Sequence, residues 1–262
     1  MSEQYYKVVK DGPVAKLTLS NPDKHNAFDD DLIKGLTDAF NLLNADADVR
    51  VVILAAEGKS FSAGADINWM KRMAGYSYEE NLTDAKALAE LLRVMNFMTK
   101  PLIGLVQGAA YGGGVGLAAV CDIVLATSKA SFCLSEVKLG LMPAAISPYV
   151  VAAIGARAAR RYFLTAERFD AQTAYQLGLV HELVEPEALH SRERELVQML
   201  LSNGPKAIAA AKDLIVAVDQ PLTDNLIALT AARICDIRAS DEGREGLSAF
   251  LEKRKPNWLA EE

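Results

Sequence analysis

The sequence predicts an α/β protein with a helical C-terminal part, and three observations support this prediction. Continuous apolar runs at residues 51–55 and 102–106 have the length and composition of buried strands. Residues 78–98 between them have the spacing of a helix. From about Pro186 onward the chain has the pattern of three or four helices and no strand signal. Strands that alternate with helices along a chain are typical of α/β folds.

The first elements follow from local patterns. Residues 5–20 alternate around the turn Asp11-Gly12, which predicts a β-hairpin. Proline and asparagine predict a loop over residues 21–28, and an amphipathic helix begins at residues 29–31. The strand at 51–55 then leads into the loop GKSFSAGADI.

The second half of the chain continues the same pattern. Pro101 stops the helix over 78–98 before the strand at 102–106, and a glycine-rich turn then opens a small apolar helix. The elements expected after it are strands at 123–126 and 131–134, three short helices from Ser147 onward, and a last extended piece at Leu183-Val184.

Length and composition bound the class of protein. A chain of 262 residues with 51% apolar residues can bury a large core, as one domain or as one domain with a small appendage. No apolar run reaches the roughly 20 residues that cross a bilayer, and the first residues lack the pattern of a signal peptide, so we expect a cytoplasmic protein with no membrane partner. The three cysteines Cys121, Cys133 and Cys235 are odd in number and widely spaced, which favours neither disulfides nor a metal site.

The net charge of −6, with no long basic block, argues against nucleic acid as the main partner. The glycine-rich turn at Gly112, Gly113 and Gly114 does not fit a nucleotide-binding motif, because Leu117 stands where the last glycine of a dinucleotide fingerprint belongs and no phosphate-binding lysine follows. Backbone N–H groups at the start of its helix nevertheless suit a developing anion.

Six segments together resemble the enoyl-CoA hydratase/isomerase (crotonase) superfamily over nearly the whole chain. They are NPDKHNAF at 21–28, FSAGADI at 61–67, QGAAYGGGVGLAAVCDIVLA at 107–126, FCLSEVKLGLMPAA at 132–145, ERFDAQTAYQLGLVHELV at 167–184, and FLEKRKPNW at 250–258. The resemblance implies a spiral of β-β-α repeats that forms two roughly perpendicular sheets over residues 1–195. It also implies a C-terminal helical region over 196–262 that makes a homotrimer, often paired into a hexamer.

The resemblance implies that the substrate is an acyl-CoA thioester and that no cofactor is needed besides this coenzyme A. Two backbone N–H groups, by position those of Ala65 and Gly113, would stabilise a thioester enolate. The residues that the resemblance places near coenzyme A are Lys24, Ala63, Asp66, Ile67, Lys253 and Arg254. The residues expected along the acyl pocket, by position and spacing, are Trp69, Met70, Gly116 and Ser147.

One catalytic carboxylate is present where hydratases of this superfamily commonly have two. Glu136, in LSEVKLG, matches the second glutamate, but Gly116 stands in place of the first. A single carboxylate can hydrate an enoyl thioester if it returns the proton of water to Cα, and it is also sufficient to move a double bond. The expected activity is therefore hydration, with double-bond isomerisation by Glu136 as the alternative.

The run from Val137 to Val184 resembles most the bacterial methylglutaconyl-CoA and isohexenylglutaconyl-CoA hydratases of leucine and terpenoid breakdown. Where most of the superfamily has a glycine-rich segment, this chain has Pro143-Ala144-Ala145. Substrates of that group carry a distal carboxylate, and the hypothesis is that this carboxylate takes the place that Gly116 leaves open. An alternative of another class is a non-catalytic relative that binds acyl-CoA or RNA. The intact SAGAD, GGG and Glu136 motifs disfavour a protein without catalysis, and the acidic charge balance disfavours RNA.

Overall fold

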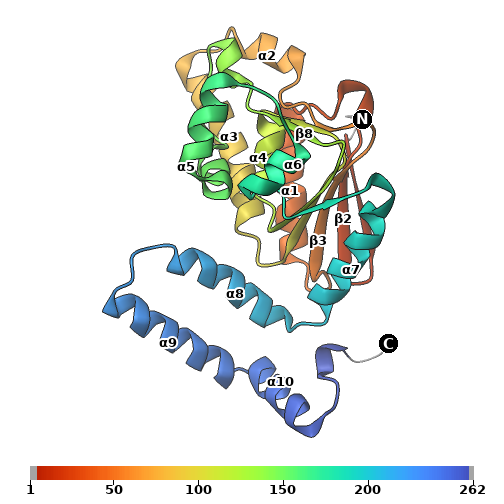
Figure 1. The fold of residues 1–262 in the computed structure, drawn as a ribbon, viewed down its shortest axis with the longest axis vertical. Helices are drawn as coiled ribbons and strands as arrows, with labels where there is room; N and C mark the ends of the chain where they lie inside the picture. Colours follow the sequence, from red (N-terminus) through yellow and green to blue (C-terminus); the bar gives the residue numbers. More distant parts are fainter. Residues whose placement is uncertain (1–4, 260–262) are drawn as a thin grey trace.

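The computed structural model describes residues 5–259, and their strands form two sheets (Figure 1). The larger sheet has six strands in the order β1-β2-β3-β5-β7-β10, and the smaller has four in the order β4-β6-β8-β9. The α/β class and the β-β-α repeats expected from the sequence are confirmed.

The chain opens with the predicted hairpin. Strands β1 (Tyr6–Asp11) and β2 (Val14–Leu19) pair antiparallel around Gly12, whose φ of +51° lies in the left-handed region that glycine tolerates. Helix α1 (Asp30–Ala45) begins where the Asp29 carboxylate accepts a hydrogen bond from the backbone N–H of Leu32 at 3.0 Å. It connects β2 to the parallel strand β3.

Three β-β-α repeats follow, and each places its first strand in the large sheet and its second in the small one. Both sets pair in parallel, β3-β5-β7 and β4-β6-β8. The repeats are β3 (Val51–Ala56), β4 (Ser60–Ser62), α2 (Ile67–Met73) and α3 (Tyr78–Asn96); then β5 (Leu102–Val106), β6 (Ala109–Tyr111) and α4 (Gly113–Ala119); then β7 (Ile123–Thr127), β8 (Ser131–Cys133), the 3-10 helix η2 (Glu136–Leu139) and α5 (Ser147–Thr165).

The remaining elements cover the sheets and form the C-terminal tail. They are β9 (Phe169–Asp170), α6 (Ala171–Leu177), β10 (Glu182–Val184), α7 (Leu189–Leu201), α8 (Pro205–Val218), α9 (Asp224–Ala239) and α10 (Asp241–Glu252), with three short 3-10 helices, η1 (Pro22–Lys24), η3 (Pro186–Ala188) and η4 (Asn257–Leu259). Within α5, Gly155 has φ +74° and ψ 152°, which separates the two short helices that the sequence predicts there.

Alternate residues of the large sheet face two separate cores. Val52 and Leu54 of β3 point into the main core, which α1 and α3 cover, whereas Val51 and Ile53 pack under α7. The predicted boundary at residue 195 therefore lies inside α7, whose Leu196 packs on the sheet. The segment that leaves the core begins with α8 (Figure 1).

Helices α8, α9 and α10 extend away from the two sheets (Figure 1). Lys212 of α8 ties this tail to the core, because its ammonium group pairs with the Asp122 carboxylate at 2.6 Å. Large apolar side chains remain exposed along the tail: Ile215, Val216, Val218, Leu222, Ile227, Leu229, Ile234, Leu247, Phe250 and Leu251. The two regions expected from the sequence, 1–195 and 196–262, include residues 1–4 and 260–262, which lie outside the described residues.

Candidate active site

Two loops meet where the sequence predicts the pair of oxyanion donors. The loop between β4 and α2 carries Gly64, whose φ of +85° requires glycine. A Cβ on Gly64 would lie 2.9 Å from the carbonyl oxygen of Tyr111 and 3.7 Å from the backbone nitrogen of Gly113. The structure therefore brings the SAGAD loop directly against the glycine-rich turn.

The backbone of this loop is fixed by Phe28. The Phe28 N–H donates to the carbonyl oxygen of Gly64 at 2.8 Å, and the Asp66 N–H donates to the carbonyl oxygen of Phe28 at 2.9 Å. Within residues 5–259, the N–H groups of Ala65 and Gly113 donate to no protein acceptor. Two free N–H donors on adjacent loops are the kind of groups that stabilise an oxyanion.

Close packing explains the glycines of the turn. A Cβ on Gly113 would lie 2.2 Å from the Phe28 ring, and one on Gly114 would lie 2.5 Å from the carbonyl oxygen of Ser62. Gly112 has φ +50°, and its Cβ position is 3.3 Å from Oε1 of Glu136. Any larger residue would move the N–H donors or the carboxylate.

Glu136 lies beside this turn, at the start of η2. Its Oε2 is buried and has no hydrogen-bond partner within the described part of the chain. Burial raises the pKa of the Glu136 carboxyl above its ordinary value. A buried carboxylate with a free oxygen and a raised pKa is suited to accept and return a proton.

A cavity of about 680 Å³ contains Glu136, Gly113 and Ala65 together. Apolar side chains form most of its wall, and the polar side chains on it, apart from the Trp69 indole, are those of Glu136, Asn81 and Asp84. The other lining residues are Phe28, Trp69, Met73, Ala85, Leu88, Gly140, Leu141, Met142, Pro143, Ala144, Ala145 and Ile146. The segment 140–146 thus forms one side of the cavity.

The structure brings one of the four expected acyl-pocket residues to this wall. Trp69 lines the cavity, whereas Met70, Gly116 and Ser147 do not. The Ser147 hydroxyl instead donates to the carbonyl oxygen of Ala144 at 2.8 Å, within its own turn.

The place beside Gly116 is not open, which corrects the hypothesis that a substrate carboxylate occupies it. A Cβ on Gly116 would lie 2.2 Å from Cγ2 and 2.9 Å from Cβ of Ile146, so the Ile146 side chain fills this space. Ile146 is itself buried. Any acyl group in the cavity meets Ile146 rather than Gly116.

Three residues of this site, Phe28, Asp84 and Ile146, are not among those expected from the sequence. Asp84 of α3 accepts a hydrogen bond from the indole N–H of Trp69 at 3.1 Å, and Trp69 packs against Phe28 with ring centroids 6.3 Å apart. The available signal was the helical spacing of Asn81, Asp84 and Leu88, which places them on one face of α3.

The residues expected near coenzyme A fall into two groups. Lys24 and Asp66 lie together, with Nζ of Lys24 3.5 Å from Oδ2 of Asp66. Asp66 caps α2 by accepting hydrogen bonds from Asn68 and Trp69, and the neighbouring Ala63 and Ile67 are exposed.

Lys253 and Arg254 are not brought to this site within one chain. The Arg254 guanidinium pairs with the carboxylates of Glu245 and Glu252 at 2.6 and 2.7 Å. Helix α10, which these residues follow, lies at the opposite end of the molecule from α2 (Figure 1).

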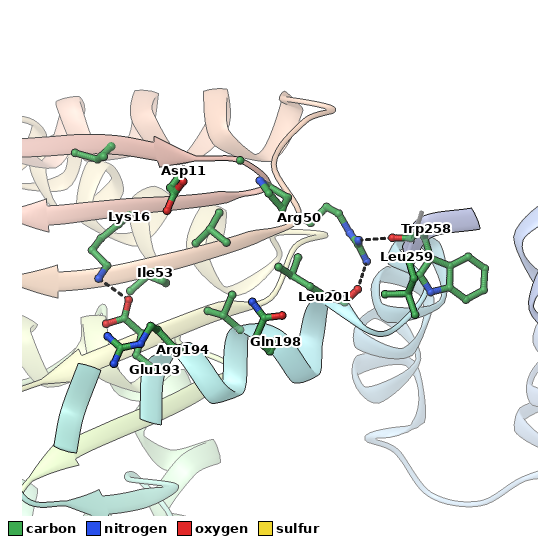
Figure 2. Close-up of a pocket in the computed structure, with 15 residues that line it drawn as sticks. Asp11, Lys16, Arg50, Ile53, Glu193, Arg194, Gln198, Leu201, Trp258 and Leu259 are labelled. Carbon is green, nitrogen blue, oxygen red and sulfur yellow. Dashed lines mark hydrogen bonds and ion pairs between the residues drawn. The ribbon is translucent and has the colours of Figure 1, made fainter. Parts of the chain in front are cut away.

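A second cavity, of about 900 Å³, lies between the β1-β2 hairpin, α7 and the C-terminal segment (Figure 2). Two of its charged side chains are paired or hydrogen-bonded: Lys16 pairs with Glu193, and the Arg50 guanidinium donates to the carbonyl oxygens of Leu201 and Trp258 (Figure 2). None of the residues expected to act in catalysis or binding lines this cavity.

Residues 5–259 contain no group of three metal-ligating side chains placed to hold a metal ion. No helix among them is long and apolar enough to cross a membrane. The three cysteines are free, with Cys121 and Cys133 buried and Cys235 exposed.

Comparison with known proteins gives consistent matches over nearly the whole chain. The family model described as enoyl-CoA hydratase/isomerase matches residues 10–261. The chain is 32% identical over 252 residues to the short-chain-enoyl-CoA hydratase of Clostridium acetobutylicum, covering 94% of each protein. It is 32% identical over 254 residues to the crotonyl-CoA hydratase of Syntrophomonas wolfei, covering 96% of each. The crystal structure of an enoyl-CoA hydratase from Shewanella pealeana superposes with a TM-score of 0.95 at 46% identity, covering 98% of this chain and 97% of that one.

Proposed function

Because the chain belongs to the enoyl-CoA hydratase/isomerase family, we propose that Glu136 catalyses the addition of water to an α,β-unsaturated acyl-CoA thioester. The observation that carries this proposal is the meeting of two free N–H donors, those of Ala65 and Gly113, with one buried carboxylate in a single cavity. This arrangement fits a reaction that passes through an enolate.

The proposed reaction balances with one carboxylate. The oxygen of water forms a bond to Cβ while Glu136 accepts a proton from that water. The electron pair of the double bond moves toward the thioester carbonyl oxygen, where the N–H groups of Ala65 and Gly113 stabilise the negative charge. Glu136 then returns its proton to Cα, so that no cofactor is required besides the coenzyme A of the substrate.

The finer proposal is a glutaconyl-type substrate, of the kind formed in the breakdown of leucine or of terpenoids. It is supported by the segment Pro143-Ala144-Ala145, which replaces the glycine-rich segment common in the superfamily. These three residues line the cavity, so this departure from the glycine-rich segment lies where the acyl group is proposed to bind. With Ile146 beside Gly116, the distal carboxylate must bind elsewhere on the wall.

Isomerisation of a double bond is the second candidate function. It is favoured by the absence of a carboxylate at Gly116, because a proton transfer between two carbons needs only Glu136. Hydration and isomerisation share the enolate and therefore the same N–H donors.

An assay of three thioesters separates these functions. Crotonyl-CoA and 3-methylglutaconyl-CoA report water addition, and a 3-enoyl-CoA reports isomerisation, with Glu136→Gln as the blank. We expect hydration of both conjugated thioesters and faster hydration of 3-methylglutaconyl-CoA. Equal rates on the two would overturn the glutaconyl preference, and turnover of the 3-enoyl-CoA alone would replace hydration by isomerisation.

A further inference from the structure

One carboxylate of the acyl cavity has no role in the proposed reaction. Asp84 lies on the face of α3 that lines the cavity, together with Asn81, Ala85 and Leu88, and it is the ionisable residue of that face. Its Oδ1 accepts the indole N–H of Trp69 at 3.1 Å. Its Oδ2 has no hydrogen bond or ion pair to any residue among 5–259.

Holding Trp69 does not by itself require a carboxylate. An amide oxygen would accept the same indole N–H and would cost less to place in a partly buried, mostly apolar wall. Burial raises the pKa of Asp84 above its ordinary value and the nearby Asp30 of α1 also raises it, while the Trp69 hydrogen bond and Arg72 of α2 lower it. The chain therefore has an ionisable acceptor, Asp84, where a neutral amide oxygen would accept the indole N–H of Trp69 equally well.

The neighbouring polar group of the wall is also an acceptor. The side-chain amide nitrogen of Asn81 donates to the carbonyl oxygens of Tyr76 and Ser77, at 3.1 and 3.0 Å, which leaves its oxygen as the free polar atom. Asn81 and Asp84 both line the cavity, and the side-chain atoms that no described residue engages are oxygens, which calls for a proton donor on the ligand.

We propose that Asp84 recognises the distal end of the acyl chain by hydrogen bonding to a protic group that the chain carries there. This inference rests on the proposed function and assigns the site for the distal carboxyl that the space beside Gly116 does not provide. In a glutaconyl-type thioester, the distal carboxyl and Asp84 share one proton, because two ionised carboxylates in contact would repel each other. Binding of such a substrate therefore takes up a proton.

This proton uptake should make the KM values of two substrates of the same enzyme depend differently on pH. Crotonyl-CoA has no distal carboxyl, so its KM does not depend on Asp84 ionisation. The ratio of the KM values for 3-methylglutaconyl-CoA and crotonyl-CoA should rise with pH, by up to about tenfold per pH unit between pH 5.5 and 8. The other charged groups that face the cavity or lie around Asp84 act on both substrates and largely cancel in this ratio; they are Glu136, Asp30, Arg72, Glu79 and Glu80.

The variant Asp84→Asn keeps an acceptor for Trp69 and cannot share a proton in this way. We expect its KM ratio to be independent of pH. The matched control is Asp38→Asn, which removes an exposed carboxylate of α1 and should keep the original slope.

The proposal is overturned if the unmodified enzyme shows no rise of the ratio with pH, a result that needs no variant to fold. It is equally overturned if Asp84→Asn keeps the slope, since Asp84 would then serve Trp69 alone. Failure of the proposed function would give a different result from failure of the Asp84 proposal, because the unmodified enzyme would then hydrate neither thioester at any pH.

Discussion

Ile146 and Gly116 are complementary in shape: Cγ2 of Ile146 lies 2.2 Å from the position that a Cβ on Gly116 would take. The two residues come from α4 and from the segment before α5, and both are buried. The space in which other hydratases of the superfamily keep a glutamate is therefore occupied by an apolar side chain. This contact leaves Glu136 as the one carboxylate proposed to act in catalysis.

The first prediction concerns this contact. Gly116→Ala should destabilise the fold by about 1–3 kcal/mol, because the added methyl group overlaps Ile146. Ile146→Ala removes Cγ2. This substitution should lower the free energy of unfolding less in the Gly116→Ala variant than in the unmodified protein. Chemical denaturation of the four proteins measures this coupling. Strictly additive changes in the free energy of unfolding would contradict the packing described.

Much of the fold was predictable because its signals are local. The runs at 51–56 and 102–106 are continuous and apolar, since strands covered on both faces need apolar residues at every position. The Asp29 cap and the Asp11-Gly12 turn likewise act within a few residues. Each of these features is determined by residues within the segment that forms it.

The wall of the cavity was less accessible to prediction. Asp84 and Trp69 are 15 residues apart, and Ile146 meets Gly116 across 30 residues, so neither contact has a sequence spacing that indicates it. A small residue at position 116 signals an absent glutamate, but only tertiary packing decides whether the space is empty or filled.

Replacement of the proposed proton carrier is the second prediction. Glu136→Gln should lower kcat for crotonyl-CoA hydration by about 10²–10⁴-fold, because the amide cannot accept the proton of water. Binding of the thioester, measured by calorimetry, should remain close to that of the unmodified protein. Retained turnover, with Asp38→Asn as the matched surface control, would remove Glu136 from the mechanism.

The third prediction follows from the raised pKa of Glu136. Burial raises this pKa in the folded state, so above its ordinary value the folded protein holds a proton that the unfolded chain has lost. The contribution of Glu136 to stability is therefore most favourable at low pH and declines as pH rises through the folded-state pKa. Glu136→Gln should be more stable than the unmodified protein at neutral pH.

Thermal unfolding over a series of pH values measures this effect. The stability difference between Glu136→Gln and the unmodified protein should shrink as pH falls toward the ordinary glutamate pKa. A stability difference between the two proteins that is the same at every pH would show that burial does not disfavour the ionised form of Glu136.

The fourth prediction tests the oxyanion donors. Gly64→Ala places a methyl group 2.9 Å from the carbonyl oxygen of Tyr111 at a φ of +85°, which should displace the neighbouring Ala65 N–H. We expect kcat to fall by about 10²–10³-fold, the loss typical of one oxyanion donor. Gly12→Ala is the matched control, because Gly12 also has a positive φ but lies in the open hairpin turn.

Gly12→Ala should cost about 1 kcal/mol of stability and leave kcat unchanged. If both alanine variants reduce kcat equally, backbone strain alone explains the loss and the N–H geometry does not.

The last prediction concerns the tail formed by α8, α9 and α10. Its apolar side chains include Phe250 and Leu251, which are 80% and 77% exposed in the single chain. An exposed apolar surface of this kind indicates a partner, and we propose a second and third copy of the chain, as in a homotrimer. Phe250→Glu with Leu251→Glu should then convert the trimer into a monomer, as measured by sedimentation. Leu164→Glu, at a side chain of α5 that is 74% exposed, should leave the mass unchanged. A monomeric unmodified protein, or a double variant of unaltered mass, would show that the tail does not hold the subunits together.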